Sequence, residues 1–193
     1  MALDWAPPPV AGPVLLPTGR HWDAVRTCAA VADRAFGVLD RLGASTAAII
    51  DSPARTVIWL IPPDEAPHAP WWQWDRLRPH VAVLPSPPAG LAYVGVPPAD
   101  RQDGPGIHWR VPPHWSGRYV TDADRLAEVL APAVTAIHGP TALALQCRIC
   151  RQTVPRAHAV TAHGRLTAAD RYPQRLTAHR ACARHMVIEE EGR

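Results

Sequence analysis

Lysine and asparagine are both absent from this chain of 193 residues, and each of its 20 basic residues is an arginine. The missing lysine excludes a lysine nucleophile, a Schiff base and the lysine of a phosphate-binding loop. Alanine, arginine and proline are abundant, which is the bias of GC-rich coding, so the missing lysine says more about coding than about function. The 23 prolines and 12 glycines stay below the share of about 25–30% that is typical of disordered chains.

Long hydrophobic runs are absent as well. Thr56–Ile61 is among the longest, and it is far shorter than the roughly 18 residues that a membrane span needs. The first ten residues contain Asp4, no basic residue and no unbroken apolar core, which argues against a secretory signal. We therefore expect a cytoplasmic protein without a membrane partner, whose four cysteines are thiols or metal ligands and not disulfides.

The N-terminal part of the chain divides into an arm and a helix. Residues 1–19 are rich in proline and show no periodicity, which predicts an extended arm or linker. Apolar residues then recur at steps of three and four, which is the spacing of one helix face, at Val25, Cys28, Ala32, Ala35, Leu39 and Leu42. This pattern predicts a helix over residues 23–42 with Gly43 as its C-terminal cap. On this helix Cys28 is a small buried side chain of the inner face and not a catalytic group.

The middle of the chain is expected to be rich in β-strands. Residues 47–51 and 56–61 are apolar runs separated by four residues, which predicts a hairpin, and further short strands are expected at 81–84, 92–96 and 107–111. Three of the strands are followed by Pro-Pro, which ends a strand because proline has no N–H to donate.

A second helix is expected to begin with Thr121 as its N-cap and to end at Gly139-Pro140. Pro132 lies within it and should kink or split it. Helix, strands and helix together predict an α+β domain over residues 20–139, with a mixed or antiparallel sheet and two flanking helices.

The composition changes after residue 140. Eight arginines, four histidines and three cysteines lie between Cys147 and His185, with a single acidic residue, Asp170. Two ligand pairs stand out there, Cys147-x2-Cys150 and His179-x2-Cys182. A spacing of two residues allows one tight turn, or one turn of helix, to present both side chains to a single tetrahedral ion.

We therefore predict a structural zinc site made by Cys147, Cys150, His179 and Cys182, in an arginine-rich module over residues 140–193. His179 and Cys182 are expected to share one face of a helix that Thr177 caps. His185, His158 and His163 are alternatives to His179 as the histidine ligand.

The order of knuckle, intervening segment and ligand-bearing helix resembles a treble-clef zinc finger. A short hairpin is expected from residues 157–161 and 165–168, around His163-Gly164. HNH nucleases share this arrangement but use a catalytic histidine in the hairpin and commonly an asparagine. The chain has no asparagine, and no acidic residue adjoins His163. Residues that an HNH nuclease site uses are therefore missing, which argues against a nuclease.

Five short segments of the larger domain carry a second resemblance: HWDAVR (21–26), IDSP (50–53), WLIPP (59–63), YVGVPP (93–98) and HWRVPP (108–113). They resemble a group of small actinobacterial proteins and, more distantly, the N-terminal domain of bifunctional primase-polymerases. That family implies two carboxylates, one residue apart on a strand, which hold divalent ions. Here Asp51 is followed by Ser52 and Pro53, so the second carboxylate is missing and Asp51 is expected to cap a turn.

The leading hypothesis is a non-catalytic, zinc-containing binding protein that contacts nucleic acid or a partner of the replication or mobile-element machinery. Phosphate contacts are expected from the arginines Arg148, Arg151, Arg180 and Arg184. Trp72, in the cluster Trp71-Trp72-x-Trp74, is expected to stack on bases or to bind a protein, although such a cluster also serves as an aromatic lid over a core. The alternative is an enzyme, either a diverged primase-polymerase or a zinc-dependent nuclease, and two close acidic groups that converge with His108 on one cleft would favour it.

Overall fold

A computed structural model of the chain describes residues 5–63, 74, 76–78, 80–84, 91–113, 115–155, 158–164 and 174–184, with the backbone alone at 163, 164, 174 and 175. The chain divides into two compact units, Met1–Ala142 and Leu143–Arg193. Both contain antiparallel strands and helix, so the α+β class is confirmed. In the described part of the chain, each helix is too short or too polar to cross a membrane.

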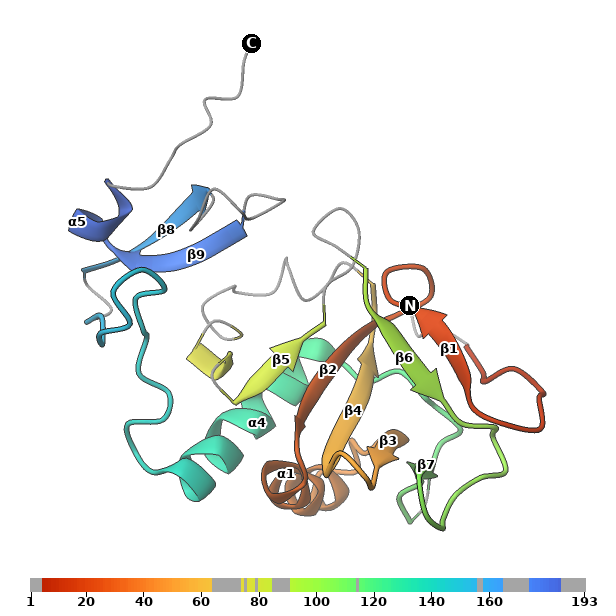
Figure 1. Cartoon of the computed structure of the whole chain (residues 1–193). Coiled ribbons are helices and arrows are strands. Elements are labelled where there is room, and N and C mark those ends of the chain that lie inside the picture. The colour runs from red at the N-terminus through yellow and green to blue at the C-terminus, as the bar shows by residue number, and fades with distance from the viewer. Residues whose placement is uncertain are drawn as a thin grey trace. The chain divides into compact units, whose positions relative to one another are not determined.

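Unit 1 is built on a five-stranded sheet, seen in the centre of Figure 1. Its order is β5-β2-β4-β3-β7, and each neighbouring pair is antiparallel. The strands are β2 (Asp23–Cys28), β3 (Ala48–Asp51), β4 (Thr56–Ile61), β5 (Val81–Val83) and β7 (Ile107–Arg110). A separate two-stranded ribbon pairs β1 (Val14–Pro17) with β6 (Tyr93–Val96).

Both faces of the five-stranded sheet are covered, which explains the continuous apolar run in β4. Ile58 and Leu60 point to one face, where they join a buried cluster with Val94 and Val96 of the ribbon strand β6. Trp59 points to the other face and meets Phe36 of α1 at a ring-centroid distance of 5.1 Å. A strand that is buried on both faces has no reason to alternate polar and apolar residues.

In the described part of unit 1, the helices α1 (Ala29–Arg41) and α4 (Ala123–His138) pack against each other (Figure 1). The helix predicted over residues 23–42 is wrong in its first six residues, because these form the strand β2 between β4 and β5. Cys28 is the last residue of that strand and the N-cap of α1, half-buried and not part of the helix face. Leu42, predicted on the same face, is 54% exposed.

The predicted C-terminal cap of α1 is confirmed. Gly43 has a φ of 61°, a left-handed conformation that glycine adopts at little cost. The N–H groups of Gly43 and Ala44 donate to the carbonyls of Asp40 and Leu39, which satisfies the last turn of the helix.

The second helix differs from the prediction at its start and in its middle. Asp122 and not Thr121 is the N-cap, since its carboxylate accepts from the N–H of Arg125 at 2.7 Å. Thr121 is buried instead, and its hydroxyl bonds with that of Thr46. Pro132 does not split the helix, which runs on to His138 before Gly139 ends it with a φ of 92°.

The arm predicted over residues 1–19 is not a free linker. Residues 14–17 pair in register with β6, from Val14 opposite Val96 to Pro17 opposite Tyr93. Trp5 packs edge-to-face on Trp22 at 5.8 Å and contributes to the same buried cluster as the sheet. The N-terminal segment is therefore part of unit 1, held by aromatic packing that its proline-rich composition does not reveal.

The hairpin and the strand ends follow the predictions from sequence. β3 and β4 pair antiparallel around the four-residue loop 52–55. The strands β4, β6 and β7 end at Ile61, Val96 and Arg110, at or one residue before the position that precedes a Pro-Pro pair. Proline cannot continue the ladder of hydrogen bonds, so these boundaries are set locally.

Candidate metal centre

The first ligand pair lies on a knuckle in unit 2. The N–H of Cys147 donates to the carbonyl of Gln152 and the N–H of Arg151 donates to that of Cys147, both at 2.8 Å, which folds residues 147–152 into a tight turn. Arg151 adopts a left-handed φ of 60° to close it. The N–H of Arg148 donates to the carbonyl of Thr177 at 2.9 Å, and this bond ties the knuckle to the strand that carries the second ligand pair.

The second ligand pair lies where a hairpin runs into a helix. β8 (Ala159–Gly164) pairs antiparallel with β9 (Gln174–His179), and α5 (Arg180–Ala183) follows directly. His179 is the last residue of β9 and the N-cap of α5, and Cys182 lies in that helix. The order of knuckle, hairpin and ligand-bearing helix is the one predicted.

Two details of this prediction are wrong. The second strand of the hairpin is 174–179 and not 165–168, which lie outside the described residues, and His163 lies within β8 and not in the turn. Thr177 is a buried residue of β9 and does not cap the helix. His179 and Cys182 therefore meet because a strand turns into a helix between them, and not because they share a helix face.

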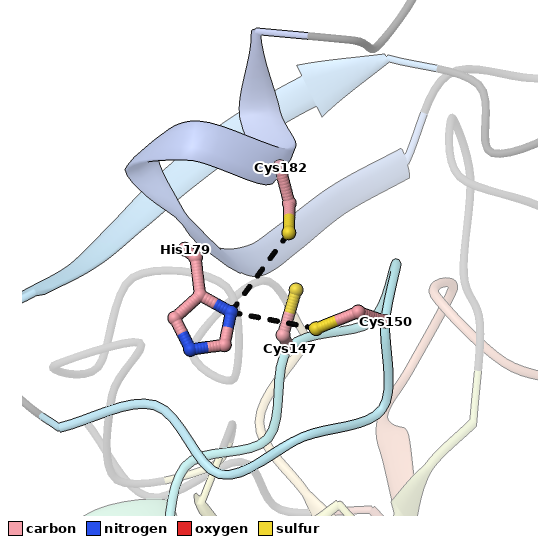
Figure 2. A group of neighbouring side chains, drawn as sticks. All are labelled: Cys147, Cys150, His179 and Cys182. Carbon is pink, nitrogen blue, oxygen red and sulfur yellow. Dashed lines mark hydrogen bonds between the residues drawn. The ribbon is translucent and has the colours of Figure 1, made fainter.

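The four ligand atoms of Cys147, Cys150, His179 and Cys182 all lie within 4.8 Å of one another, without a disulfide among the three cysteines (Figure 2). Nδ1 of His179 is 3.5 Å from Sγ of Cys150 and 3.9 Å from Sγ of Cys182. Figure 2 shows the other ring nitrogen, Nε2, turned away from the sulfur atoms. Two soft-ligand pairs that meet in this way can hold one metal ion.

The protonation of the thiols shows why a cation suits this site. Burial acts to raise the pKa of Cys147, but N–H groups of Cys150, His179 and Ile149 donate to its sulfur and lower that pKa to about 6. The pKa of Cys182 is raised to about 11 by burial, by hydrogen bonds with Cys147 and Cys150 and by repulsion from their charge. Three thiolates so close together repel one another, and a divalent cation between them removes that repulsion.

A small apolar cluster packs against the site. Cys147 is 1% exposed and packs with Val154 and Ala178, and partly buried neighbours complete the cluster. Cys150 is exposed by comparison. The site therefore has one buried sulfur that joins it to the core of unit 2 and one sulfur that faces solvent.

The structure places His179 in the ligand cluster. His158 is exposed and outside the ligand cluster, and His185 lies beyond the described residues. His163 is described by its backbone alone, opposite Arg175 in the β8–β9 ladder. This placement depends on strand pairing, which the spacing of histidines along the chain does not determine.

The arginines expected to contact nucleic acid are found on the surface. Arg148, Arg151, Arg180 and Arg184 are all exposed. The described part of unit 2 has no acidic residue, and it has no ion pair of these arginines. Their positive charge is therefore unbalanced within that part of the module.

Asp51 and His108, which could serve an enzyme only together, do not converge. In the β3–β7 ladder Ile50 lies opposite His108 and Asp51 opposite Ile107, so Asp51 and His108 extend from opposite faces of the sheet. The Oδ1 atom of Asp51 accepts from the N–H of Ala54 at 3.1 Å, which is the turn-capping role expected for it. In the described residues, the group made by the three cysteines and His179 is the one cluster suited to a metal.

The tryptophan cluster is described at one position. Trp74 is 3% exposed, so it packs inside unit 1 and does not present its ring to a base. Trp71 and Trp72 lie outside the described residues, and the stacking role predicted for Trp72 stays a prediction.

No protein-family model matches the chain, and neither a curated protein nor a solved structure shows significant similarity to it. The function must therefore be argued from the geometry of the chain itself.

Proposed function

We propose that unit 2 is a zinc-stabilised nucleic-acid-binding module and that the protein acts as a non-catalytic binding protein. The observation that carries the proposal is the convergence of three sulfur atoms and one imidazole nitrogen within 4.8 Å. Three thiolates and one imidazole fill all four positions of a tetrahedral ion, which is typical of a structural zinc site and not of a catalytic one with an open position.

The interatomic distances support zinc. Bond lengths of about 2.3 Å to sulfur and about 2.05 Å to nitrogen give a sulfur–nitrogen separation of about 3.6 Å across a tetrahedron. The Nδ1 atom of His179 is 3.5 and 3.9 Å from two of the sulfurs, close to that value. These two separations need to change little when an ion is bound.

The charge of the module supports nucleic acid as its partner. Four exposed arginines, two beside the knuckle and two beside the second ligand pair, face no carboxylate in the described part of unit 2. Zinc bound by three thiolates adds only one negative charge. The arginines therefore still give the described part of the module a net positive charge. Arginine-rich surfaces bind phosphates by releasing counterions, and this binding carries no base specificity.

The test is binding of fluorescently labelled single-stranded and duplex oligonucleotides to the zinc-loaded full-length protein, measured by anisotropy across salt. Three phosphate contacts give a slope of log affinity against log salt of about −3. Replacing both Arg148 and Arg151 with glutamine should weaken binding to all sequences alike and make that slope shallower.

Arg34→Gln is the matched control, because Arg34 is an exposed arginine of α1 in the other unit. This variant should bind as the original protein does. If the zinc-loaded protein binds neither kind of oligonucleotide at about 50 mM salt, where phosphate contacts are strong, the proposal is wrong.

A further inference from the structure

A cavity of about 550 Å³ adjoins the metal centre within unit 2 and is lined by His158, His179, Arg180, Ala181 and Arg184. Its volume lies in the range of about 300–1,000 Å³ that is typical of small-molecule sites. It is formed by the segment before β8 together with the start and the end of α5. Residues from two parts of the module that are distant in sequence therefore line one pocket, which is open to solvent.

The side chains around this cavity are suited to donating hydrogen bonds. Arg180 and Arg184 are four residues apart and each carries a guanidinium group, which has five N–H donors and no acceptor. The described residues contain no ion pair of either arginine and no acidic side chain in unit 2. The described residues of unit 2 therefore leave the charge of Arg180 and Arg184 unbalanced.

His179 links this cavity to the metal centre. Its Nδ1 atom faces the sulfurs of Cys150 and Cys182, and its Nε2 atom is turned away from them (Figure 2). When Nδ1 binds a metal, the remaining ring proton is held on Nε2, and metal-bound histidines almost always donate that proton to an oxygen acceptor. Among the described residues, the hydrogen bonds of His179 involve Nδ1 and none is found for Nε2.

We propose that this cavity is a phosphate site, in which Arg180, Arg184, His158 and the Nε2–H of His179 hold a tetrahedral phosphate group. Forked guanidinium groups match the oxygen geometry of phosphate, and the imidazoles add further N–H donors. This inference rests on the proposed function, and it names the cavity in which the module would hold phosphate. The group comes either from a nucleic acid or from a free phosphomonoester.

The first experiment uses the full-length zinc-loaded protein with ¹⁵N-labelled histidine, and inorganic phosphate as the probe. Adding phosphate should shift the NMR signals of the His179 and His158 side chains. Arg184→Gln and Arg180→Gln should each weaken phosphate binding about tenfold or more, because each removes charge-assisted hydrogen bonds. Arg34→Gln is the matched control, an exposed arginine of α1 outside the cavity lining, and it should leave phosphate affinity unchanged. Zinc content shows that each variant keeps its fold.

The second experiment separates the sources of the phosphate. The same oligonucleotide is measured with a 5′-phosphate and with a 5′-hydroxyl group. If Arg184→Gln weakens both equally, the cavity holds a backbone phosphate, and if it weakens only the phosphorylated strand, the cavity holds a terminal one. Both outcomes support the site.

The remaining outcomes distinguish this inference from the proposed function. If phosphate shifts the histidine signals but no oligonucleotide binds, the cavity is a site for a free phosphomonoester, and the proposed nucleic-acid function is wrong. If oligonucleotides bind through Arg148 while phosphate leaves the histidine signals unmoved, the proposed function stands and the phosphate site is overturned. If neither ligand binds, both are overturned.

Discussion

His80 and His138 stack face to face, with ring centroids 4.0 Å apart and an angle of 20° between their planes. The stack joins the segment before β5 to the last turn of α4, within unit 1. Burial and the charge of His138 lower the pKa of His80, and a hydrogen bond with the backbone of Ala142 opposes them. The folded protein therefore favours the neutral form of His80.

This stack predicts that unit 1 loses stability in mild acid. Above the unfolded pKa of about 6.5, His80 is neutral in both states and its contribution is fully present. As the pH falls from 6.5 towards the lowered folded pKa, the unfolded chain takes up a proton that the folded one resists. The melting temperature should fall by roughly 2–4 °C for each kcal/mol lost.

All eight tryptophans lie in unit 1, so their fluorescence reports the melting of that unit alone. His138→Gln removes the repelling charge and should reduce the loss between pH 7.5 and 5.5, whereas His21→Gln, an exposed histidine, should not. An identical pH profile for His138→Gln and the original protein would rule out coupling within the stack.

The metal centre predicts that Cys150→Ser abolishes stoichiometric zinc. Elemental analysis should find one zinc per chain in the original protein and almost none in this variant, because the tetrahedral shell loses one of its four ligands. A small module with few large apolar residues depends on its metal, so unit 2 should unfold while the tryptophan signal of unit 1 persists.

Cys28→Ser is the matched control, since Cys28 lies at the N-cap of α1 in unit 1, apart from the cluster. It should keep its zinc. Zinc retained by Cys150→Ser, or absent from freshly purified and reduced original protein, would contradict the assignment.

Thiol labelling should separate the ligand cysteines from Cys28. With metal bound, Cys147, Cys150 and Cys182 are protected, because their sulfurs are occupied as thiolate ligands. Adding a strong chelator should expose these three to a thiol reagent, and mass spectrometry of peptides would show which residues are modified. The labelling rate of Cys28 should not change on chelation, and a parallel increase at Cys28 would indicate that the whole protein unfolds.

Replacing Pro132 is expected to stabilise unit 1. It is an exposed residue inside α4, where proline provides no N–H for the carbonyl of Glu128. Pro132→Ala restores this donor and should stabilise unit 1 by about 1–3 kcal/mol, after the entropy gained by the unfolded chain is subtracted. Pro113→Ala, at an exposed proline after β7, should bring no such gain in melting temperature. An unchanged melting temperature for Pro132→Ala would mean that the missing hydrogen bond costs nothing in this helix.

Local patterns were sufficient for several features of this protein. Gly43 follows the apolar stripe of α1 and takes a left-handed φ, and the four-residue loop between β3 and β4 makes a hairpin. The spacing of Cys147 and Cys150 identified a knuckle. These features depend on residues a few positions apart, so their physical causes can be recognised in the sequence itself.

Other features were decided by contacts between distant segments. Residues 23–28 carry a helix-like spacing, yet they form β2, because β4 and β5 supply hydrogen bonds on both of its edges. Likewise, the β8–β9 register and the bond from Arg148 to Thr177 bring His179 to the three cysteines. The register of β3 and β7 separates Asp51 from His108 by placing them on opposite faces of the sheet. The sequence by itself determined which chemical groups this protein has and where its local turns lie. Only the tertiary structure decided which groups meet, because pairing between strands depends on partners that are distant along the chain.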